Sequence, residues 1–535
     1  MKIILLFCSL WLILGFNVAA SNQPDTLFWS GNIDITEDIY IDEQTTLVIS
    51  PGTVVTAHNQ SKIETRGNVF AIGQFDNKII FMAADTIGLW DTATINGGWG
   101  GFHLLDNPNG EAHFKHCTFE YGKANIPGSW YGSEGSSDNL EGNQGGAFRI
   151  TYYQNITFDY CNFYNNFART IGGAIYCRKA HNLIITNCDF TQNKVLAYGG
   201  AIYYYDFIYN LQIEHCVFKR NIAWSKTSTN DVFSNGAALF IMSWGPPESQ
   251  CLIQNTYFFN NISLTTLALL NKKSSVVNNI FTNNFNFSTI HFGMLQSEHF
   301  AHNNTIANNY YNHSGIPGVT SFSRQLHFYN NILWNNFSDS IADNDKALTW
   351  FSSPPDVQYC LVWESRIDGE NIIKADPLFV NPAPGYGLDY NGWEYDWSLQ
   401  DISPAINSGT PDTTGLNIPP FDLHGNPRIF GGRIDMGAYE NQNVWVSLPE
   451  NLLVNARLVA APNPFRNAFS VELFGPEKVK RIKVYNQTGT PVRQMATLWH
   501  EGLVSIDMSG FTSGLYVLAV EYENGTVKTE RMVKM

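Results

Sequence analysis

The sequence has few charged residues and no long apolar run after its N-terminal segment, and both absences narrow its possible functions. Charged residues make up only 15% of the chain, whereas aromatic residues make up 14%. Because Asn and Gly are also abundant, the composition favours β-structure with many turns over helix bundles. No later stretch has 18 consecutive apolar residues, so we expect a soluble mature chain without a transmembrane segment. The net charge of −15 argues against nucleic acid as a partner, because its phosphates would be repelled.

Motifs of common enzymes and metal sites are also missing. The sequence has no G-x-S-x-G, H-E-x-x-H or phosphate-binding glycine loop. Seven cysteines follow Cys8, and no two of them form a C-x-x-C pair. Their spacing therefore predicts neither a zinc site nor an obvious disulfide framework. Any functional site has to be inferred from the fold.

The N-terminus has the pattern of a secretory signal peptide. Lys2 precedes an apolar run, and the small residues Ala19 and Ala20 form a site typical of signal peptidase cleavage. We therefore assign residues 1–20 to a signal peptide and expect the mature chain to start at Ser21. Cys8 lies inside the apolar run, which does not fit a lipid-attachment cysteine.

A short segment recurs along the chain with a period of about 27 residues, interrupted by insertions. Its copies centre on Cys117, Cys161, Cys188, Cys216, Thr256, Asn279, Asn304, Asn331 and Cys360. Around each copy the apolar positions alternate with period two and then change phase, as expected for short strands separated by two-residue bends. The pattern predicts a solenoid with about three strands per coil. Its cysteines are best interpreted as free thiols stacked in the core, with a disulfide between neighbouring coils as the alternative.

Asparagine and glycine recur with the same period. Asn precedes the central residue in many copies, which fits a bend with left-handed backbone. A second Asn column, three residues after the aromatic position, includes Asn166, Asn193, Asn221, Asn261, Asn284, Asn309 and Asn336. Glycine-rich strand starts follow this column, as at Gly172 and Gly173.

This pattern resembles the right-handed parallel β-helix of the pectate-lyase-like superfamily, over roughly Asp25 to Glu440. The resemblance implies an all-β, single-stranded solenoid, with N-terminal capping coils at 21–115 and the β-helix with its terminal segment at 116–440. It does not imply one activity, because this fold hosts lyases, hydrolases, adhesins and phage tailspikes.

The end of the solenoid contains Ser403-Pro404-Ala405-Ile406, Asp422-Leu423-His424-Gly425 and Asp435-Met436-Gly437-Ala438. These motifs resemble the terminal segment of a family named for its variable choice of surface anchor. Asp422, Asp435 and Glu440 are candidate ligands for Ca²⁺, the only cofactor that the sequence offers. Carboxylates beside Gly and Asn in tight turns usually accept hydrogen bonds from backbone amides instead.

After a linker at 441–457, the repeat gives way to a compact β-pattern at 458–535. It opens with Ala461-Pro462-Asn463-Pro464-Phe465 and ends with Gly514-Leu515-Tyr516-Val517 and a basic tail. This region strongly resembles the type A C-terminal sorting domain of the type IX secretion system of the Bacteroidetes. The resemblance implies a small β-sandwich that is recognised by the secretion machinery and then removed. It further implies an extracellular protein, usually attached to lipopolysaccharide at the outer-membrane surface.

A glycan groove is the favoured site hypothesis. The insertions 121–144 and 223–234 leave the same corner of the solenoid and would stand on either side of two plain coils. Alternation places the following residues on the outer floor between them: Arg149, Tyr176, Arg178, Tyr203 and Tyr205. Trp130 and Tyr131 would lean in from the first insertion. Exposed Tyr beside Arg suits a polysaccharide with carboxylates or sulfates, although surface aromatics also simply favour strands.

Two other functions stay open. A polysaccharide lyase or hydrolase would need acid–base groups, and the candidates are Asp159, Asp189, Glu214, Arg178, Lys179 and Arg220. Solvated strand charges explain these residues equally well. The third hypothesis is an adhesive shaft without a pocket.

Overall fold

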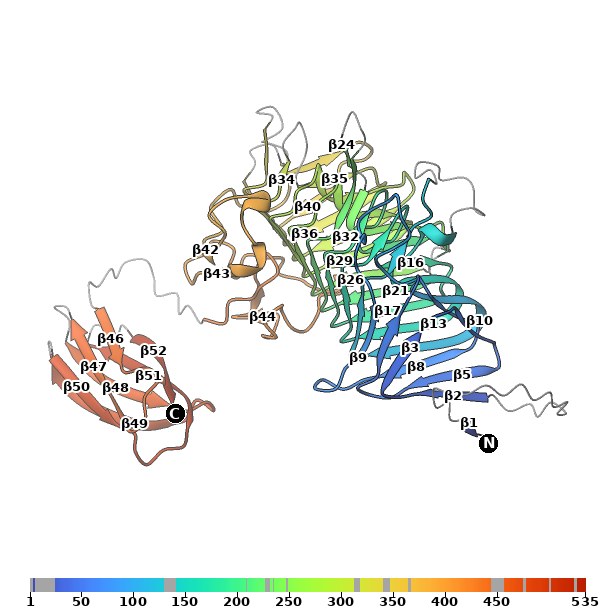
Figure 1. Cartoon of the computed structure of the whole chain (residues 1–535). Coiled ribbons are helices and arrows are strands. Elements are labelled where there is room, and N and C mark those ends of the chain that lie inside the picture. The colour runs from blue at the N-terminus through green and yellow to red at the C-terminus, as the bar shows by residue number, and fades with distance from the viewer. Residues whose placement is uncertain are drawn as a thin grey trace. The chain divides into compact units, whose positions relative to one another are not determined.

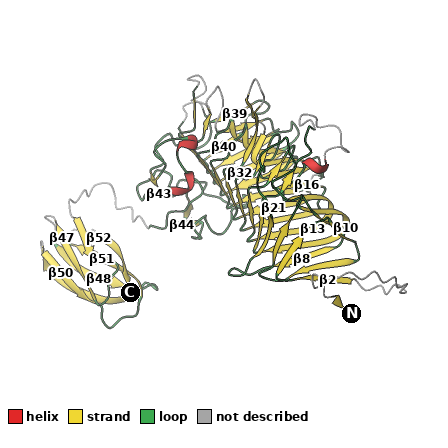
Figure 2. Ribbon diagram, viewed as in Figure 1, coloured by secondary structure: helices red, strands yellow, loops and turns green. Residues whose placement is uncertain are grey.

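The structure is a computed structural model in which two compact units are separated between Asn443 and Val444. It describes residues 3–4, 25–128, 141–207, 209–226, 231–233, 235–246, 249–311, 318–339, 347–363, 367–443, 457–474, 478–499, 502–523 and 527–535. Strands dominate both units (Figures 1 and 2). The described part of the chain contains no helix that is long and apolar enough to cross a membrane.

The first unit is a parallel β-helix, in which each strand pairs with the equivalent strand of the next coil (Figure 1). Strands of the first face start each coil: β4 (Ile39–Ile41), β7 (Ile63–Thr65), the start of β10 (Phe102–Lys115), the start of β13 (Phe148–Asp159), β16 (Ile175–Arg178), β20 (Ile202–Tyr205), β25 (Asn235–Met242), β28 (Thr265–Leu270), β31 (Ser288–Phe292), β35 (Val319–Ser321) and β39 (Leu348–Trp350).

The second face continues the same sheet around a bend. Its strands are β1 (Ile3–Ile4), β2 (Asp25–Trp29), β5 (Thr45–Ile49), β8 (Asn68–Ile72), the ends of β10 and β13, β17 (Asn182–Thr186), β21 (Asn210–Glu214), β26 (Gln250–Gln254), β29 (Lys273–Val277), β32 (Glu298–His302), β36 (Gln325–Tyr329) and β40 (Asp356–Gln358).

The third face is a separate parallel sheet. It consists of β3 (Asn32–Ile35), β6 (Val54–Ala57), β9 (Ile79–Ala83), β11 (Cys117–Glu120), β14 (Asn162–Tyr164), β18 (Asp189–Thr191), β22 (Val217–Lys219), β27 (Tyr257–Phe259), β30 (Ile280–Thr282), β33 (Thr305–Ala307), β37 (Ile332–Trp334) and β41 (Leu361–Val362). The strands from β11 to β41 coincide with the repeats found in the sequence.

Short strands at the corner between the third and first faces complete many coils, so these coils have four strands rather than the three expected. They are β12 (Lys123–Ala124), β15 (Phe167–Ala168), β19 (Lys194–Val195) and β23 (Ile222–Lys226), with β24 (Asp231–Phe233) forming a hairpin on β23, and β34 (Tyr310–Tyr311) with β38 (Phe337–Ser338) further along. Two residues are too few to show an alternation, which is why the sequence pattern missed these strands.

Left-handed bends separate the faces, as the Asn pattern predicted. Asn187 has φ 54° and Asn255 has φ 50°, and the equivalent Tyr160 has φ 52°. The second Asn column is buried up to Asn309 and forms a continuous ladder from Asn166 to the half-buried Asn336. Side-chain Nδ2 donates to the next Oδ1 at 2.9 to 3.1 Å in every link. Like residues therefore stack directly above like residues.

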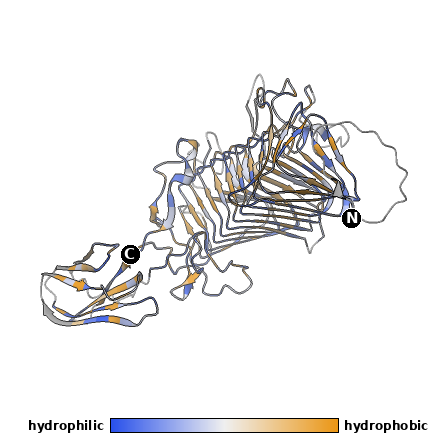
Figure 3. Cartoon of the chain, turned by 60° about the horizontal axis from the view of Figure 1, so that its bottom comes forward, coloured by the Kyte–Doolittle hydropathy of each residue, from blue (hydrophilic) through white to orange (hydrophobic). Residues whose placement is uncertain are grey.

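The core repeats in the same way. Successive phenylalanines of the third face stack with ring centroids 4.3 to 5.2 Å apart: Phe81, Phe119, Phe163, Phe190, Phe218, Phe258 and Phe281. Cys161, Cys188 and Cys216 form a buried column of free thiols, and the backbone N–H of Cys161 donates to Cys188 Sγ at 3.3 Å. This confirms the stacked-thiol interpretation. Hydrophobic residues recur along the strands of successive coils (Figure 3).

The terminal segment folds back over the outside of the third face. It contains β42 (Phe379–Asn381), β43 (Asp396–Leu399), β44 (Ile429–Phe430), β45 (Arg433–Ile434) and the 3-10 turns η2 (Gly387–Asp389) and η3 (Gly392–Glu394); a further turn, η1 (Glu141–Asn143), precedes β13. Trp397 and Phe379 pack with Phe259 and Ile332 of the third face in one apolar cluster. The segment therefore covers the third face of the later coils.

The second unit is a sandwich of two antiparallel sheets around its own core. Its strands are β46 (Arg457–Ala461), β47 (Ala468–Phe474), β48 (Val479–Tyr485), β49 (Pro491–Trp499), β50 (Gly502–Asp507), β51 (Gly514–Tyr522) and β52 (Val527–Lys534). Phe465, from the Pro-Asn-Pro opening, is 1% exposed in this core.

Candidate functional site

The predicted floor residues lie on the expected side of the first face, but they do not form an open floor. Arg149, Tyr176 and Tyr203 pair in register on the side away from the core. They are only 7%, 5% and 5% exposed, respectively. The two tyrosines pack with Phe240 in a second apolar cluster, and Arg149 Nη2 pairs with Glu141 Oε1 at 2.7 Å. The expected exposure was wrong, because alternation fixes the side of a sheet and not what covers that side.

The insertions do leave the same corner. The first follows β12 and the second includes the β23–β24 hairpin, and both strands belong to the corner sheet. Trp130 and Tyr131 lie outside the described residues, so their predicted contribution to a groove stays a prediction.

Arg178 and Tyr205, the other two floor residues, lie at the accessible bend between the first and second faces. The Arg178 guanidinium carbon is 5.7 Å from the centre of the Tyr152 ring and 5.9 Å from that of Tyr205. Lys179 Nζ lies 4.8 Å above the Tyr152 ring and donates a hydrogen bond to its hydroxyl at 3.1 Å. Trp244, from the next coil, meets Tyr205 edge-on at 5.6 Å. We call this group the Tyr152 corner: Tyr152, Arg178, Lys179, Tyr205, Asp206, Phe207 and Trp244.

The backbone presents these side chains at a repeated bend. Tyr152, Lys179 and Asp206 have φ of 52°, 56° and 78°, so three non-glycine residues adopt left-handed backbone at equivalent positions. Such conformations are strained for L-residues and place the side chains on the outside of the bend. Successive coils are about 4.8 Å apart, so the corner forms a line of rings and charges along the solenoid axis.

The Tyr152 corner is locally cationic and unusually rich in exposed rings. Asp206 is its single carboxylate and lies 3.5 Å from Arg178 Nε and 3.2 Å from Lys179 Nζ. Among the described residues, the Arg178 side chain donates no hydrogen bond, so its terminal nitrogens are available to a ligand. Tyr152 and Trp244 are each 42% exposed and Phe207 is 41% exposed. Hydrogen bonding with Tyr152 raises the pKa of Lys179, so this second cation stays charged at neutral pH.

The predicted site residues did not include Tyr152, Phe207 or Trp244. A usable signal exists, since Tyr152, Lys179 and Asp206 are spaced at the 27-residue period of the coils. Tyr152 and Asp206 fall at the bend between the first and second faces, where the alternation of apolar residues is interrupted, and Lys179 was predicted only as a catalytic candidate.

The six candidate catalytic residues do not converge. Asp159 ends the second-face part of β13, where Lys115 Nζ lies 2.8 Å away. Burial raises its pKa, but hydrogen bonds from Lys115, Asn187 and Thr186 outweigh this effect and lower it overall. Glu214 also ends a second-face strand, whereas Asp189 lies on the third face.

The basic candidates are equally scattered. Arg178 and Lys179 belong to the Tyr152 corner, while Arg220 Nη2 donates to Asn391 of the terminal segment at 2.9 Å. Among the described residues, no ion pair joins one of the three carboxylate candidates to one of the three basic candidates, so their catalytic role stays a prediction.

The three candidate calcium ligands already have partners. Asp422 Oδ1 accepts hydrogen bonds from the backbone N–H of His424 and Asn426, and Asp435 accepts from Asn407 and Asn441. Glu440 Oε2 accepts from the buried Arg428 Nη1 at 2.8 Å. Because N–H groups face these oxygens, the cluster ties turns together and does not have the geometry of a Ca²⁺ site. The described residues contain no group of three or more His, Cys, Asp or Glu side chains arranged to hold a metal ion.

Comparisons with known protein families agree with the architecture. A family model described as a right-handed beta helix region matches residues 105–261. The chain is thus a right-handed parallel β-helix protein. A second family model, described as a secretion system C-terminal sorting domain, matches residues 460–535.

The chain therefore combines a β-helix with a type IX secretion system sorting domain. This sorting domain identifies it as a protein secreted to the cell surface or the extracellular space. A comparison with curated protein sequences finds no significant match.

Proposed function

We propose that this protein binds an acidic extracellular glycan through the Tyr152 corner. The observation that carries the proposal is the set of exposed rings around Arg178, whose guanidinium donates no hydrogen bond among the described residues. Rings stack on the apolar faces of sugars, and a guanidinium binds carboxylate or sulfate with two parallel hydrogen bonds. A cationic corner on a chain with a net charge of −15 is a specific feature rather than a general property of the surface.

Binding without cleavage is favoured over a lyase or hydrolase. Cleavage needs an acid or base within hydrogen-bond reach of the reacting bond, and the only carboxylate at the Tyr152 corner, Asp206, contacts both Lys179 and Arg178. The linear arrangement of the corner fits a polymer that lies along the coils.

The proposal is tested by retention of the full mature protein on immobilised acidic polysaccharides: polygalacturonate, alginate, chondroitin sulfate and heparin. We expect retention on at least one, weakening as salt increases. Arg178→Gln should lower the affinity about 10- to 100-fold, since a charge-assisted hydrogen bond contributes about 1.5–3 kcal/mol. Tyr152→Ala should weaken retention less, by the loss of one stacking surface.

Tyr160→Ala is the matched control. Tyr160 is also an exposed tyrosine at a left-handed bend, with φ 52° and with Lys115 Nζ 5.6 Å from its ring, but it lies between the second and third faces. Retention should be unchanged in this variant. Equal retention of wild type and Arg178→Gln, or absence of retention on all four polymers, contradicts the proposal. Release of unsaturated products would instead support a lyase.

A further inference from the structure

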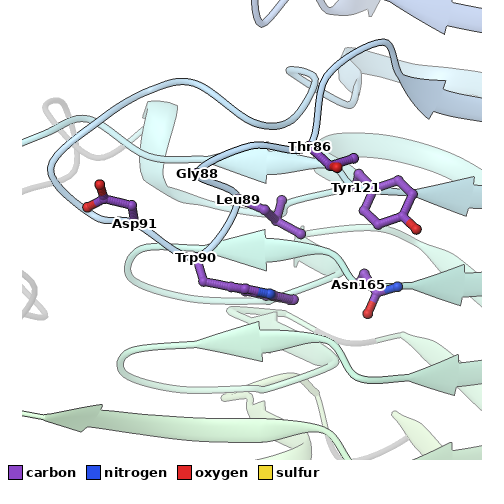
Figure 4. Close-up of a pocket in the computed structure, with 7 residues that line it drawn as sticks. All are labelled: Thr86, Gly88, Leu89, Trp90, Asp91, Tyr121 and Asn165. Carbon is purple, nitrogen blue, oxygen red and sulfur yellow. The ribbon is translucent and has the colours of Figure 1, made fainter.

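A pocket lies at a different bend of the coil, between the third and first faces. It has a volume of about 370 Å³, and its walls include Trp90, Tyr121, Asn165, Thr86 and Asp91. Tyr121 follows β11 and Asn165 follows β14, so both belong to the bend at the end of the third face, and the segment before β10 lies over them (Figure 4). The pocket shares no residue with the Tyr152 corner.

The loop that carries Trp90 is held in place by a buried lysine. Lys123 is 1% exposed, and its ammonium donates hydrogen bonds to the backbone carbonyls of Gly88 at 2.7 Å, Asp91 at 3.0 Å and Asn96 at 2.6 Å. Asn125 Nδ2 donates to the carbonyl of Thr94 at 2.7 Å. One buried cation therefore fixes both ends and the middle of the loop. This arrangement preorganises the position of Trp90.

Although Lys123 holds its loop in place, the Trp90 side chain does not pack into the core of the solenoid. Its ring meets Phe167 edge-on at 6.0 Å, and Lys194 Nζ lies 5.8 Å from its centre. The residue nevertheless remains 41% exposed. Much of the largest apolar side chain is thus held at a fixed place in contact with water, and the pocket opens beside it.

The polar wall of the pocket includes the side chain of Asn165. At the same bend in later coils, Asn260, Asn283 and Asn308 donate to backbone carbonyls of the terminal segment. In the described part of the chain, the hydrogen bonds and ring contacts of the terminal segment begin only at Lys219 and Arg220, beyond the coils that carry Tyr121 and Asn165. Among the described residues the Asn165 side chain has no hydrogen-bond partner, although it occupies the equivalent position, with φ 55°. Its amide is therefore available to a ligand.

We infer that this pocket binds a neutral pyranose, as a single residue or at the end of a chain. An indole and a phenol ring provide stacking surfaces, while the Asn165 amide and the Thr86 hydroxyl match sugar hydroxyls. The pocket volume lies at the small end of the range for ligand sites. Asp91 turns its carboxylate away from Trp90 and Asn165 (Figure 4), where it accepts a hydrogen bond from the backbone N–H of Ala93. No Lys or Arg side chain is part of the pocket wall to attract an anionic sugar. The ligand class therefore differs from that of the Tyr152 corner.

Affinity electrophoresis of the full mature protein tests this inference. Its net negative charge drives migration, and neutral β-glucan, galactomannan or α-glucan in the gel should retard it. We expect retardation by at least one of them, and Trp90→Ala should reduce the apparent affinity at least 10-fold. Trp350→Ala is the matched control, because Trp350 is 40% exposed and lies outside both sites; it should migrate as wild type does.

Lys123→Met tests whether the Trp90 ring must be held in place by Lys123 to bind a ligand. This variant keeps the Trp90 ring but removes the three hydrogen bonds to the loop, so retardation should weaken while melting of the solenoid stays cooperative. If it does not fold, the Trp90→Ala result decides alone. The inference is overturned if no neutral polymer retards the wild type, or if Trp90→Ala is retarded equally. The two sites are distinguished by crossing the variants: Arg178→Gln should leave neutral binding intact, and Trp90→Ala should leave acidic binding intact.

Discussion

Replacing one asparagine inside the ladder should destabilise the solenoid far more than replacing one on its surface. Asn221 Oδ1 accepts hydrogen bonds from the backbone N–H and the side-chain amide of Asn193, at 3.1 and 3.0 Å, and its Nδ2 donates to the carbonyl of Phe190 at 2.8 Å. Asn221→Leu keeps the number and branching of the side-chain heavy atoms, but it leaves the buried backbone N–H of Asn193 without its partner. It also removes one hydrogen bond each from the Asn193 side-chain amide, the Phe190 carbonyl and Asn261 Oδ1, although the Asn193 amide still donates to the carbonyl of Phe163. At about 1–3 kcal/mol for the unsatisfied group and about 0.5–1.5 kcal/mol for each of the other hydrogen bonds, the expected loss is about 3–6 kcal/mol after local relaxation.

Urea unfolding of the full chain, followed by circular dichroism, measures this loss. Asn182→Ala is the control, because the half-buried Asn182 makes one side-chain hydrogen bond, to Asn155 Oδ1 at 2.7 Å, and its removal should change stability by less than about 1 kcal/mol. Hydrogen exchange of the backbone amide of Asn193 should also accelerate in Asn221→Leu. If Asn221→Leu unfolds within about 1 kcal/mol of wild type, or if both variants lose the same amount, the ladder does not stabilise the stacking as argued.

Two further predictions concern buried titratable groups. Burial lowers the pKa of His299 and of His302 to about 4, so the folded state holds fewer protons than the unfolded state, and stability present above about pH 6.5 is lost as pH falls toward 4. By pH 5 the free energy of unfolding should fall by on the order of 2 kcal/mol per histidine. In urea unfolding, His299→Gln should make the free energy of unfolding depend less on pH. An unchanged pH dependence in this variant would contradict the prediction. Burial also raises the pKa of Cys251 and Cys360 to about 12. All seven free thiols are buried, so they should resist a thiol reagent at pH 8 and react once the chain is unfolded in guanidinium. Fewer than seven reacting then would indicate a disulfide.

The sequence predicted which side of the first face each residue occupies, but not whether that side is exposed to solvent. If the predicted floor residues face outward, the alternation turns their neighbours Phe148, Ile150 and Tyr204 inward. Each of these is indeed 0% exposed, because strand periodicity reports directly which side of a sheet faces the core. Tyr176 and Tyr203 were assigned to the correct side, yet they are buried in a second cluster. No periodicity in a strand encodes the segments that cover its outer side.

The two proposed binding surfaces depend on contacts between segments far apart in the chain. The Tyr152 corner combines residues from successive coils, and its shared 27-residue spacing is visible only once the bend is known to be an exposed position. The Trp90 pocket depends on Lys123 meeting carbonyls up to 35 residues earlier. Nothing in the composition of either segment predicts that contact.

What the sequence determined by itself is the one-dimensional order: a coil of about 27 residues, left-handed bends at Asn, a column of thiols, and a separate C-terminal sorting domain. Each is a local or periodic property, and stacking copies of one unit converts it into structure with little further information. The tertiary structure alone decided which outer sides are covered, which carboxylates pair with amides instead of a metal, and where rings remain in water. Those outcomes depend on how insertions and the terminal segment pack on the solenoid, and packing between distant segments follows no period.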